Sequence, residues 1–254
     1  MKYKAVIADV DGTLIEPGSV PILKVSLKLQ KAVGSLHKKG IHFGLATGRS
    51  LDWVDGLLEP LKIDSPIILD NGAKIYDCLN KKYLREFYLA ENLFRDVMET
   101  LQDFNDIIYF VNDSQRSVYE INKKHIIDKV SKIMILHVAP DKAEKIYQIL
   151  IKNSQISVTK SISKHNPIAE SIHITHLKAK KEIGLEFVAS FLHLKLDEII
   201  GIGDSYNDLD FLSRCGLKIA MGNAVPEVKK IADYIVSPYD KDGVAEAIER
   251  FILH

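Results

Sequence analysis

The run Ala5-Val6-Ile7-Ala8-Asp9-Val10-Asp11-Gly12-Thr13 decides the fold of this chain. Residues 3–8 are predicted to form a buried strand, and two carboxylates follow it directly. In open α/β sheets, ligands bind beyond the carboxyl ends of the strands. Two carboxylates about 4 Å apart repel by roughly 4 kcal/mol at an effective dielectric near 20, so the pair indicates a bound cation, and its oxygen ligands suit Mg²⁺. The plainer interpretation is a solvated acidic turn.

The residues after this run alternate between apolar stretches and amphipathic ones. Apolar residues at helical spacing predict a helix that ends at Gly40, followed by strand 41–46, helix 51–61 and strand 67–69. This order implies parallel strands with right-handed crossovers. The tail from Lys178 repeats the pattern, with strands expected at 198–202, 217–220 and 233–236 and helices expected before, between and after them.

The middle of the chain has a different texture. Helices are expected at 91–104 and 141–152, among strands at 107–111, 117–121, 132–138, 156–160 and 168–175. Helices and paired strands in this order indicate a separate α+β layer inserted into an α/β protein. The predicted organisation is therefore a core of residues 1–82 and 178–254, interrupted by a cap of residues 83–177.

Further polar residues follow other predicted strands. Ala46-Thr47-Gly48-Arg49 ends strand 41–46 and opens a helix, where a hydroxyl and free amides can hold an anion, although Thr is also a common helix cap. Asp204 follows strand 198–202, and Asp208 lies four residues later near the start of a helix. Both carboxylates can approach one cation. The alternative for Asp208 is a solvated residue that favours the helix dipole.

Lysines stand where the chain re-enters the core, at Lys178, Lys180 and Lys181. Lysine at the start of a helix is ordinarily solvated. Lys181 lies four residues before Leu185 and shares its helical face, so it is expected to point inward over the sheet. Lys178 shares that face if the helix begins earlier, and it stays the alternative.

These elements, in this order, resemble the haloacid dehalogenase-like hydrolase superfamily, in particular its type IIB, Cof-type sugar-phosphatase branch. The motifs are D-x-D-G-T at residues 9–13, A-T-G-R at 46–49, the lysine after the insertion, and G-D-x-x-N-D at 203–208. Asn71-Gly72-Ala73 and Gly222-Asn223-Ala224 also resemble that branch. One departure is Lys181-Glu182, where the branch commonly has Lys-Gly. The resemblance spans the whole chain and implies a Rossmann-like doubly wound parallel-sheet core with an inserted α+β cap.

The resemblance also implies a role for each matching residue. Asp9 is expected to be the nucleophile that forms an aspartyl-phosphate, and Asp11 the general acid and base. The expected ligands of Mg²⁺ are a carboxylate oxygen of Asp9, the backbone carbonyl of Asp11, and Asp204, with Asp208 direct or through water. The expected phosphate contacts are Thr47, the amide of Gly48, Lys181 or Lys178, and Asn207. Candidate substrate contacts are Arg49, Trp53, Asn71 and the cap residue Arg116.

The composition argues against nucleic acid and membranes as binding partners. The chain has 254 residues, with 34 Lys and Arg balanced by 34 Asp and Glu, so it lacks the basic field of a general nucleic-acid binder. No stretch approaches the roughly 18 apolar residues of a membrane span. Cys78 and Cys215 have no neighbours at metal-ligand or redox spacing, which favours reduced thiols and the cytoplasm.

The sequence therefore predicts a Mg²⁺-dependent phosphatase of small phosphorylated metabolites, with sugar phosphates foremost. A phosphotransferase or phosphomutase with the same nucleophile is one alternative. A catalytically silent phosphate-binding regulator is another, disfavoured because it would not need both Asp9 and Asp11. The oligomeric state is left open.

Overall fold

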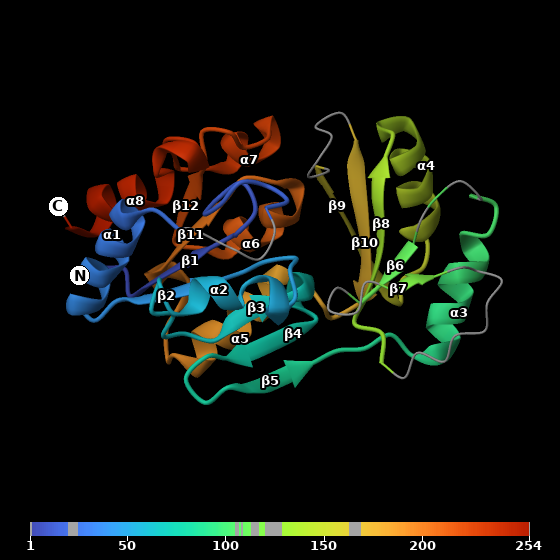
Figure 1. The fold of residues 1–254 in the computed structure, drawn as a ribbon, viewed down its shortest axis with the longest axis horizontal. Helices are drawn as coiled ribbons and strands as arrows, with labels where there is room; N and C mark the ends of the chain where they lie inside the picture. The colour runs from blue at the N-terminus through green and yellow to red at the C-terminus, as the bar shows by residue number, and fades with distance from the viewer. Residues whose placement is uncertain are drawn as a thin grey trace.

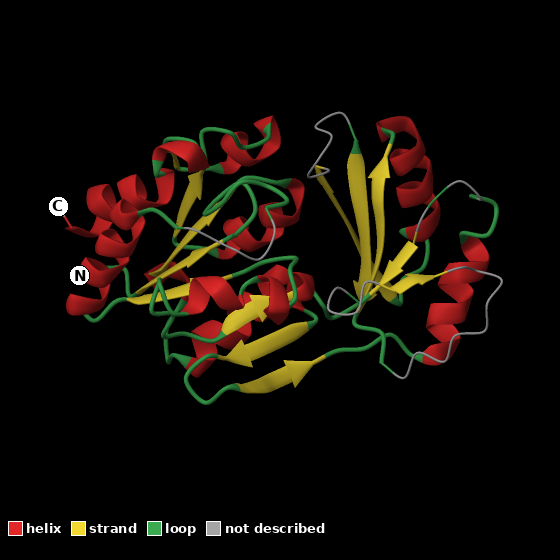
Figure 2. Cartoon of the chain, in the orientation of Figure 1, coloured by secondary structure: helices red, strands yellow, loops and turns green. Residues whose placement is uncertain are grey.

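A core that carries both termini and a cap built on a separate sheet lie side by side in the computed structural model of the chain (Figure 1). The structure describes residues 2–19, 25–104, 107, 109–112, 117–119, 129–162 and 169–253. Arg116, expected to contact substrate, lies outside these residues. Figure 2 shows helices and strands alternating in the core, and strands backed by helices in the cap.

A five-stranded parallel sheet forms the centre of the core, in the order β13-β12-β11-β1-β2. Its strands are apolar and, apart from the edge strand β13, almost wholly buried, as in parallel sheets covered on both faces. Their bounds are β1 Ala5–Ala8, β2 His42–Leu45, β11 Ile199–Gly203, β12 Leu217–Ala220 and β13 Tyr234–Ile235. β1 pairs with both β11 and β2, so Ala8 stands opposite Ile202 on one side and Leu45 on the other. This register brings the carboxyl ends of three strands together.

Helices in two groups cover the central sheet, as expected for a doubly wound fold. α1 (Leu27–Lys38) packs against α8 (Gly243–Ile248), and α5 (Lys181–Phe191) packs against α6 (Leu209–Arg214), which also contacts α7 (Pro226–Ile231). The Ser26 hydroxyl caps α1 by accepting a hydrogen bond from the Leu29 amide at 3.0 Å. The predicted fold class, an α/β protein with a parallel central sheet and an inserted cap, is confirmed.

Strand β3 (Ile67–Leu69) lies at the predicted residues but begins a second sheet. A single parallel bridge between Ala46 and Ile68 joins it to the end of β2, and it then pairs antiparallel with β4 (Lys74–Asp77), which pairs with β5 (Lys82–Glu86). Neither β4 nor β5 was predicted from the sequence. Their residues are mostly charged or half exposed, so they lack the apolar run that identifies a buried strand.

The cap consists of a five-stranded antiparallel sheet, in the order β7-β6-β8-β10-β9, with two helices on one face. The bounds are α3 Glu91–Thr100, β6 Tyr109–Val111, β7 Ser117–Tyr119, β8 Lys132–Val138, α4 Pro140–Leu150, β9 Ile156–Ile162 and β10 Glu170–His176. Alternate residues of β8 and β10, such as Ile133 and Ile172, join a hydrophobic cluster with α3 and α4. Side chains alternate along a strand, so the opposite face of this sheet carries Lys132 and Thr175 toward the core.

Two predicted helices are shorter in the structure. The helix expected at 51–61 is a 3-10 turn at Leu51–Trp53 followed by the four-residue helix α2 at Asp55–Leu58. The helix expected at 91–104 ends at Thr100. Within the described part of the chain, no helix is long and apolar enough to cross a membrane.

Candidate active site

Polar residues follow three neighbouring strands of the core. Asp9 comes directly after β1, Asp204 directly after β11, and Thr47 two residues after β2. The Asp9 amide donates to the Ile202 carbonyl at 2.9 Å, and the Thr47 amide donates to the Ile68 carbonyl at 2.8 Å, which extends the pairing past the strand ends. Because parallel strands end at one edge of the sheet, these polar side chains gather at that edge.

Three carboxylates lie close together there, and two of them bind one ammonium group. Asp9, Asp204 and Asp208 each offer a carboxylate oxygen within 4.8 Å of the others. The Lys181 ammonium donates to Asp9 Oδ1 and to Asp208 Oδ1, both at 2.7 Å. The other oxygen of Asp208 accepts from the amides of Asp204 and Ser205 at 3.0 Å, so Asp208 ties the lysine to the Asp204 loop.

Glycines make room for these carboxylates. Gly12 has a φ of 78°, and a Cβ at this position would lie 2.3 Å from Asp204 Oδ2. The Thr13 hydroxyl donates to the other oxygen of Asp204 at 3.0 Å, and the Asn223 side chain donates to the Gly12 carbonyl at 2.8 Å. The turn after β1 is therefore shaped around Asp204, and the Gly222-Asn223-Ala224 segment holds that turn in place.

Burial and the neighbouring charges shift the pKa values of the clustered residues. Burial, followed by the charges of Asp208 and Asp11, raises the pKa of Asp9 to about 7 against the opposing effect of Lys181. Burial, followed by the charges of Asp9 and Asp208, raises the pKa of Asp204 well above its ordinary value. Burial alone would lower the pKa of Lys181, but the charges of Asp208 and Asp9 raise it, so the lysine stays charged.

The structure places the two candidate lysines differently. Lys181 is the first residue of α5, and 3% of its surface is exposed. Lys178 is exposed two residues beyond the end of β10, where its amide donates to His176 Nδ1 at 3.1 Å. Only Lys181 of these two lies among the carboxylates.

Arg49 lies against Asp11. The guanidinium grips both carboxylate oxygens, with Nε 2.7 Å from Oδ2 and Nη2 2.6 Å from Oδ1. It also donates to the carbonyls of Ser19 and Trp53 at 3.2 Å, and 2% of the residue is exposed. Arg49 and Trp53 were predicted to contact the substrate; in the structure, the Arg49 guanidinium binds the Asp11 carboxylate and the Trp53 carbonyl.

The loop after β2 meets the loop after β3. The Thr47 hydroxyl accepts from the Arg49 amide at 3.1 Å, and a Cβ on Gly48 would lie 3.1 Å from Asn71 Oδ1. That oxygen of Asn71 also accepts from the Asn207 side chain at 3.1 Å. Asn71 Nδ2 is a buried donor without a hydrogen-bond partner among the described residues, and Asn71 has a φ of 54°. A buried unsatisfied donor held by a left-handed backbone is typical of a ligand contact.

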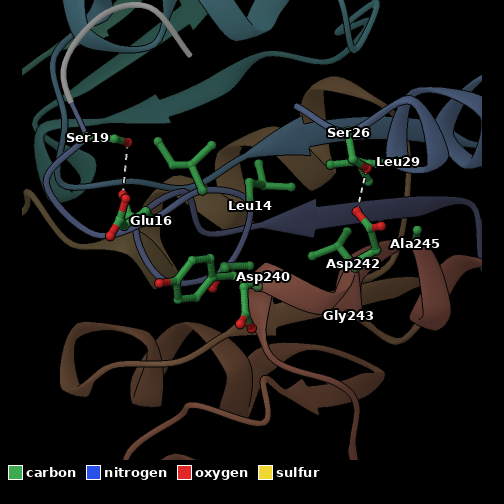
Figure 3. Close-up of a pocket in the computed structure, with 13 residues that line it drawn as sticks. Leu14, Glu16, Ser19, Ser26, Leu29, Asp240, Asp242, Gly243 and Ala245 are labelled. Atoms are coloured by element: carbon green, nitrogen blue, oxygen red, sulfur yellow. Dashed lines mark hydrogen bonds between the residues drawn. The ribbon is translucent and has the colours of Figure 1, made fainter. Parts of the chain in front are cut away.

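A cavity of about 350 Å³ lies behind the turn that follows β1 (Figure 3). Thr13 is shared with the site, and the other lining residues come from the segment after that turn, from the N-terminal end of α1, and from the 3-10 turn at Tyr239–Lys241 together with the start of α8. Asp9, Asp204 and Lys181 are not among the lining residues. The carboxylate cluster and this cavity are therefore separate sites, and the cluster does not open into the cavity.

The carboxylate cluster fits a divalent cation. Asp9, Asp204 and Asp208 supply oxygen ligands of the kind that Mg²⁺ prefers. Three carboxylates stand beside one lysine there, and a divalent cation would offset the remaining negative charge. Gly12 leaves the Asp204 carboxylate the space it occupies.

Two residues near the site escaped the sequence analysis. Asp70 and Lys132 are buried and form an ion pair of 3.0 Å between core and cap. Lys132 lies in the apolar strand β8, and no motif marks it. Asp70 directly precedes the Asn71-Gly72-Ala73 motif, and this position beside a motif is the one feature of the sequence that could have identified it.

Comparisons with known proteins agree with this arrangement. Residues 6–248 match the family model of the haloacid dehalogenase-like hydrolases. The phosphoglycolate phosphatase 1 of Saccharolobus solfataricus is 29% identical over 98% of this chain and 96% of its own length. The 5-amino-6-(5-phospho-D-ribitylamino)uracil phosphatase of Bacillus subtilis is 28% identical over the same shares of the two chains.

Solved structures share the fold. A phosphatase of the haloalkanoate superfamily from Bacteroides thetaiotaomicron has a TM-score of 0.81 at 23% identity, covering 98% of this chain and 95% of that one. A sugar phosphatase of subclass IIB has a TM-score of 0.77 at 19% identity, covering 98% of both chains. The match of the family model to nearly the whole chain, with its motifs gathered at one sheet edge, shows that this protein belongs to the haloacid dehalogenase-like hydrolases.

Proposed function

We propose that this protein is a Mg²⁺-dependent phosphatase that hydrolyses phosphate monoesters of small metabolites, with sugar phosphates as the foremost class. The observation that carries the proposal is the Lys181 ammonium at 2.7 Å from both Asp9 and Asp208, beside Asp204. The buried Asp9 carboxylate can act as a nucleophile, and the ammonium of Lys181 beside it can hold the oxygens of a phosphoryl group. The phosphatase names of the curated relatives support the same reaction class.

In the first half-reaction, a carboxylate oxygen of Asp9 attacks phosphorus and the bond to the ester oxygen breaks, which leaves an aspartyl-phosphate. Asp11 gives its proton to the departing alcohol. In the second half, Asp11 takes a proton from water, whose oxygen attacks the phosphoryl group and frees Asp9. Both carboxylate oxygens of Asp11 accept hydrogen bonds from Arg49 here, so a proton can sit on Asp11 only when one of these contacts opens.

The remaining residues hold charge and geometry. Lys181 and the amide of Gly48 would bind phosphoryl oxygens, with the Thr47 hydroxyl and the free donor of Asn71 beside them. Asp9, Asp204 and the Asp11 carbonyl would hold Mg²⁺, with Asp208 close by. When bound, the ion supplies positive charge that lets an anionic nucleophile approach an anionic ester.

The cap supplies the wall opposite this site. β9 packs against the turn Tyr206–Asp208, so cap residues lie next to the Asp208 end of the cluster. Closure of the cap would exclude water during the first half-reaction and select the leaving group. Both cysteines, Cys78 and Cys215, are free thiols, in keeping with a protein that meets its substrates in the cytoplasm.

The test is phosphate release by the purified protein with Mg²⁺ from a panel of sugar phosphates, phosphoglycolate and p-nitrophenyl phosphate. We expect release from at least one sugar phosphate, and loss of that activity on chelation with EDTA or in Asp9→Asn. Asp210→Asn is the matched control because Asp210 is an exposed aspartate on α6. Activity that persists in Asp9→Asn would exclude Asp9 as the nucleophile. Phosphate that appears on an isomeric sugar, and not in solution, would identify a mutase.

A further inference from the structure

A lysine of the cap reaches the loop that carries the expected phosphate donors. Lys132 is the first residue of β8 and is completely buried. Its ammonium donates to the Gly48 carbonyl at 2.8 Å and lies 3.0 Å from Asp70 Oδ1. Lysines are almost never fully buried unless they are paired, and burying the pair carries a desolvation cost. A cap that needed only an anchor could use apolar contacts at lower cost.

Among the described residues, the carbonyl groups of residues 47, 48 and 49 each accept a hydrogen bond from a different donor. The Thr47 carbonyl accepts from the Asn71 amide at 2.9 Å, and the Arg49 carbonyl accepts from the Asp70 amide at 2.9 Å. Both donors are backbone groups of the core. The Gly48 carbonyl, between them, accepts from the cap through Lys132. The conformation of this loop is therefore completed by a side chain from the cap.

The Gly48–Arg49 peptide connects Lys132 to Thr47, because its carbonyl binds Lys132 and its N–H binds Thr47. In a planar trans peptide, the N–H points away from the carbonyl, so the group that faces Lys132 fixes where the Arg49 N–H points. That N–H donates to Thr47 Oγ1 at 3.1 Å. Because the hydroxyl oxygen accepts this bond, its own proton can be donated to a phosphoryl oxygen. A cation on the carbonyl polarises the peptide and strengthens each bond of the chain.

We propose that Lys132 is a positioning residue, which acts through the Gly48–Arg49 peptide to aim the Thr47 hydroxyl at the transferring phosphoryl group. The inference rests on the proposed phosphatase function for the role of Thr47. Because Lys132 belongs to the cap, the donors for the phosphoryl group are fully positioned only when the cap contacts the core. The position of the cap therefore affects the rate of phosphoryl transfer.

Asp70 is the counter-ion of Lys132. Its backbone has a φ of 50°, and its other carboxylate oxygen lies 3.3 Å from the Lys74 ammonium and 3.4 Å from the Ser131 hydroxyl. Lys74 therefore pairs with the same carboxylate as Lys132, but from the core. Lys74→Met is the matched control, because it removes one cation from Asp70 and leaves the donor to Gly48 in place.

The experiment compares Lys132→Met with Lys74→Met in the full-length protein with Mg²⁺ and p-nitrophenyl phosphate. For Lys132→Met we expect kcat to fall by about 10- to 100-fold and the inhibition constant of orthovanadate, a mimic of five-coordinate phosphorus, to rise by a similar factor. KM and the Mg²⁺ concentration for half-activation should change little. Lys74→Met should keep kcat within about twofold. A purely structural lysine would lower the thermal midpoint without this split between kcat and KM.

A second readout does not need turnover. In Lys132→Met the amide proton of Arg49 should move upfield in the ¹H–¹⁵N spectrum, because its donation to Thr47 weakens, and Lys74→Met should leave it in place. If Lys132→Met does not fold, Lys132→Met/Asp70→Asn removes both buried charges and serves in the same assays. A wild-type protein that hydrolyses no ester would refute the phosphatase function, and the Arg49 resonance and vanadate binding would still decide the positioning. Unchanged kcat, vanadate inhibition and Arg49 resonance in the Lys132 variant would overturn the inference.

Discussion

Replacement of Lys181 by methionine removes the cation at the centre of the site and keeps the length of the side chain. The lysine makes two hydrogen bonds of 2.7 Å, to Asp9 and Asp208, and the side chains of all three residues are almost completely buried. Lys178→Met is the matched control, because Lys178 is exposed just before α5.

The structure sets the size of the expected effects. Loss of one preorganised donor to a transition-state oxygen costs about 100- to 1000-fold in kcat, or about 2.7–4 kcal/mol. Removal of one partner from a buried ion pair costs about 3–5 kcal/mol of unfolding free energy. The negative charge left on Asp9 and Asp208 should favour a divalent cation, so Mg²⁺ should bind Lys181→Met at least as tightly as the wild type.

The assay measures kcat and KM with p-nitrophenyl phosphate, thermal unfolding with and without Mg²⁺, and Mg²⁺ affinity by calorimetry. We expect Lys181→Met to lose kcat and thermal stability, with part of the stability regained on addition of Mg²⁺, and Lys178→Met to match the wild type. Wild-type kcat in Lys181→Met, or its loss in Lys178→Met, would refute the assignment of Lys181 as the phosphate lysine.

Three further predictions concern the turn after β1 and its neighbours. Gly12→Ala places a methyl group 2.3 Å from Asp204 Oδ2 at a φ of 78°, so the Mg²⁺ concentration for half-activation should rise at least about tenfold; an unchanged value would contradict the close approach. Arg49→Lys loses the two-pronged contact that holds Asp11 in one orientation before and after its proton transfers, so kcat should fall about tenfold at constant KM, whereas a raised KM with normal kcat would indicate a direct substrate contact. Since burial raises the pKa of Asp9 to about 7, the folded metal-free protein keeps a proton that the unfolded chain loses near pH 4. Its unfolding free energy should fall as the pH rises from about 4 to about 7, and Mg²⁺ affinity should increase over the same range and then level off; a calorimetric titration with constant affinity would contradict the shift.

Local pattern was sufficient where a segment's structure depends on its own residues. The apolar strands β1 and β12 and the helix α1 lie close to where periodicity predicts them. In buried strands and amphipathic helices, the spacing of apolar residues reflects which side chains face the core. The hairpin β4–β5 carries no such signal. It is held by pairing with β3 and leaves much of its surface exposed, so its polar residues resembled a loop.

The sequence by itself determined the positions of the parallel strands along the chain and the carboxylates at their ends, Asp9 and Asp204, because parallel strands end at one edge of a sheet. The order of the strands in the sheet came from the structure. Only the tertiary structure decided which lysine enters the cluster, that Arg49 grips Asp11, and that Lys132 completes the loop at Gly48. These contacts join residues between 27 and 172 positions apart. Charge and hydrogen bonding at such separations depend on how helices, loops and the cap meet in space, and no local spacing in the chain encodes that meeting.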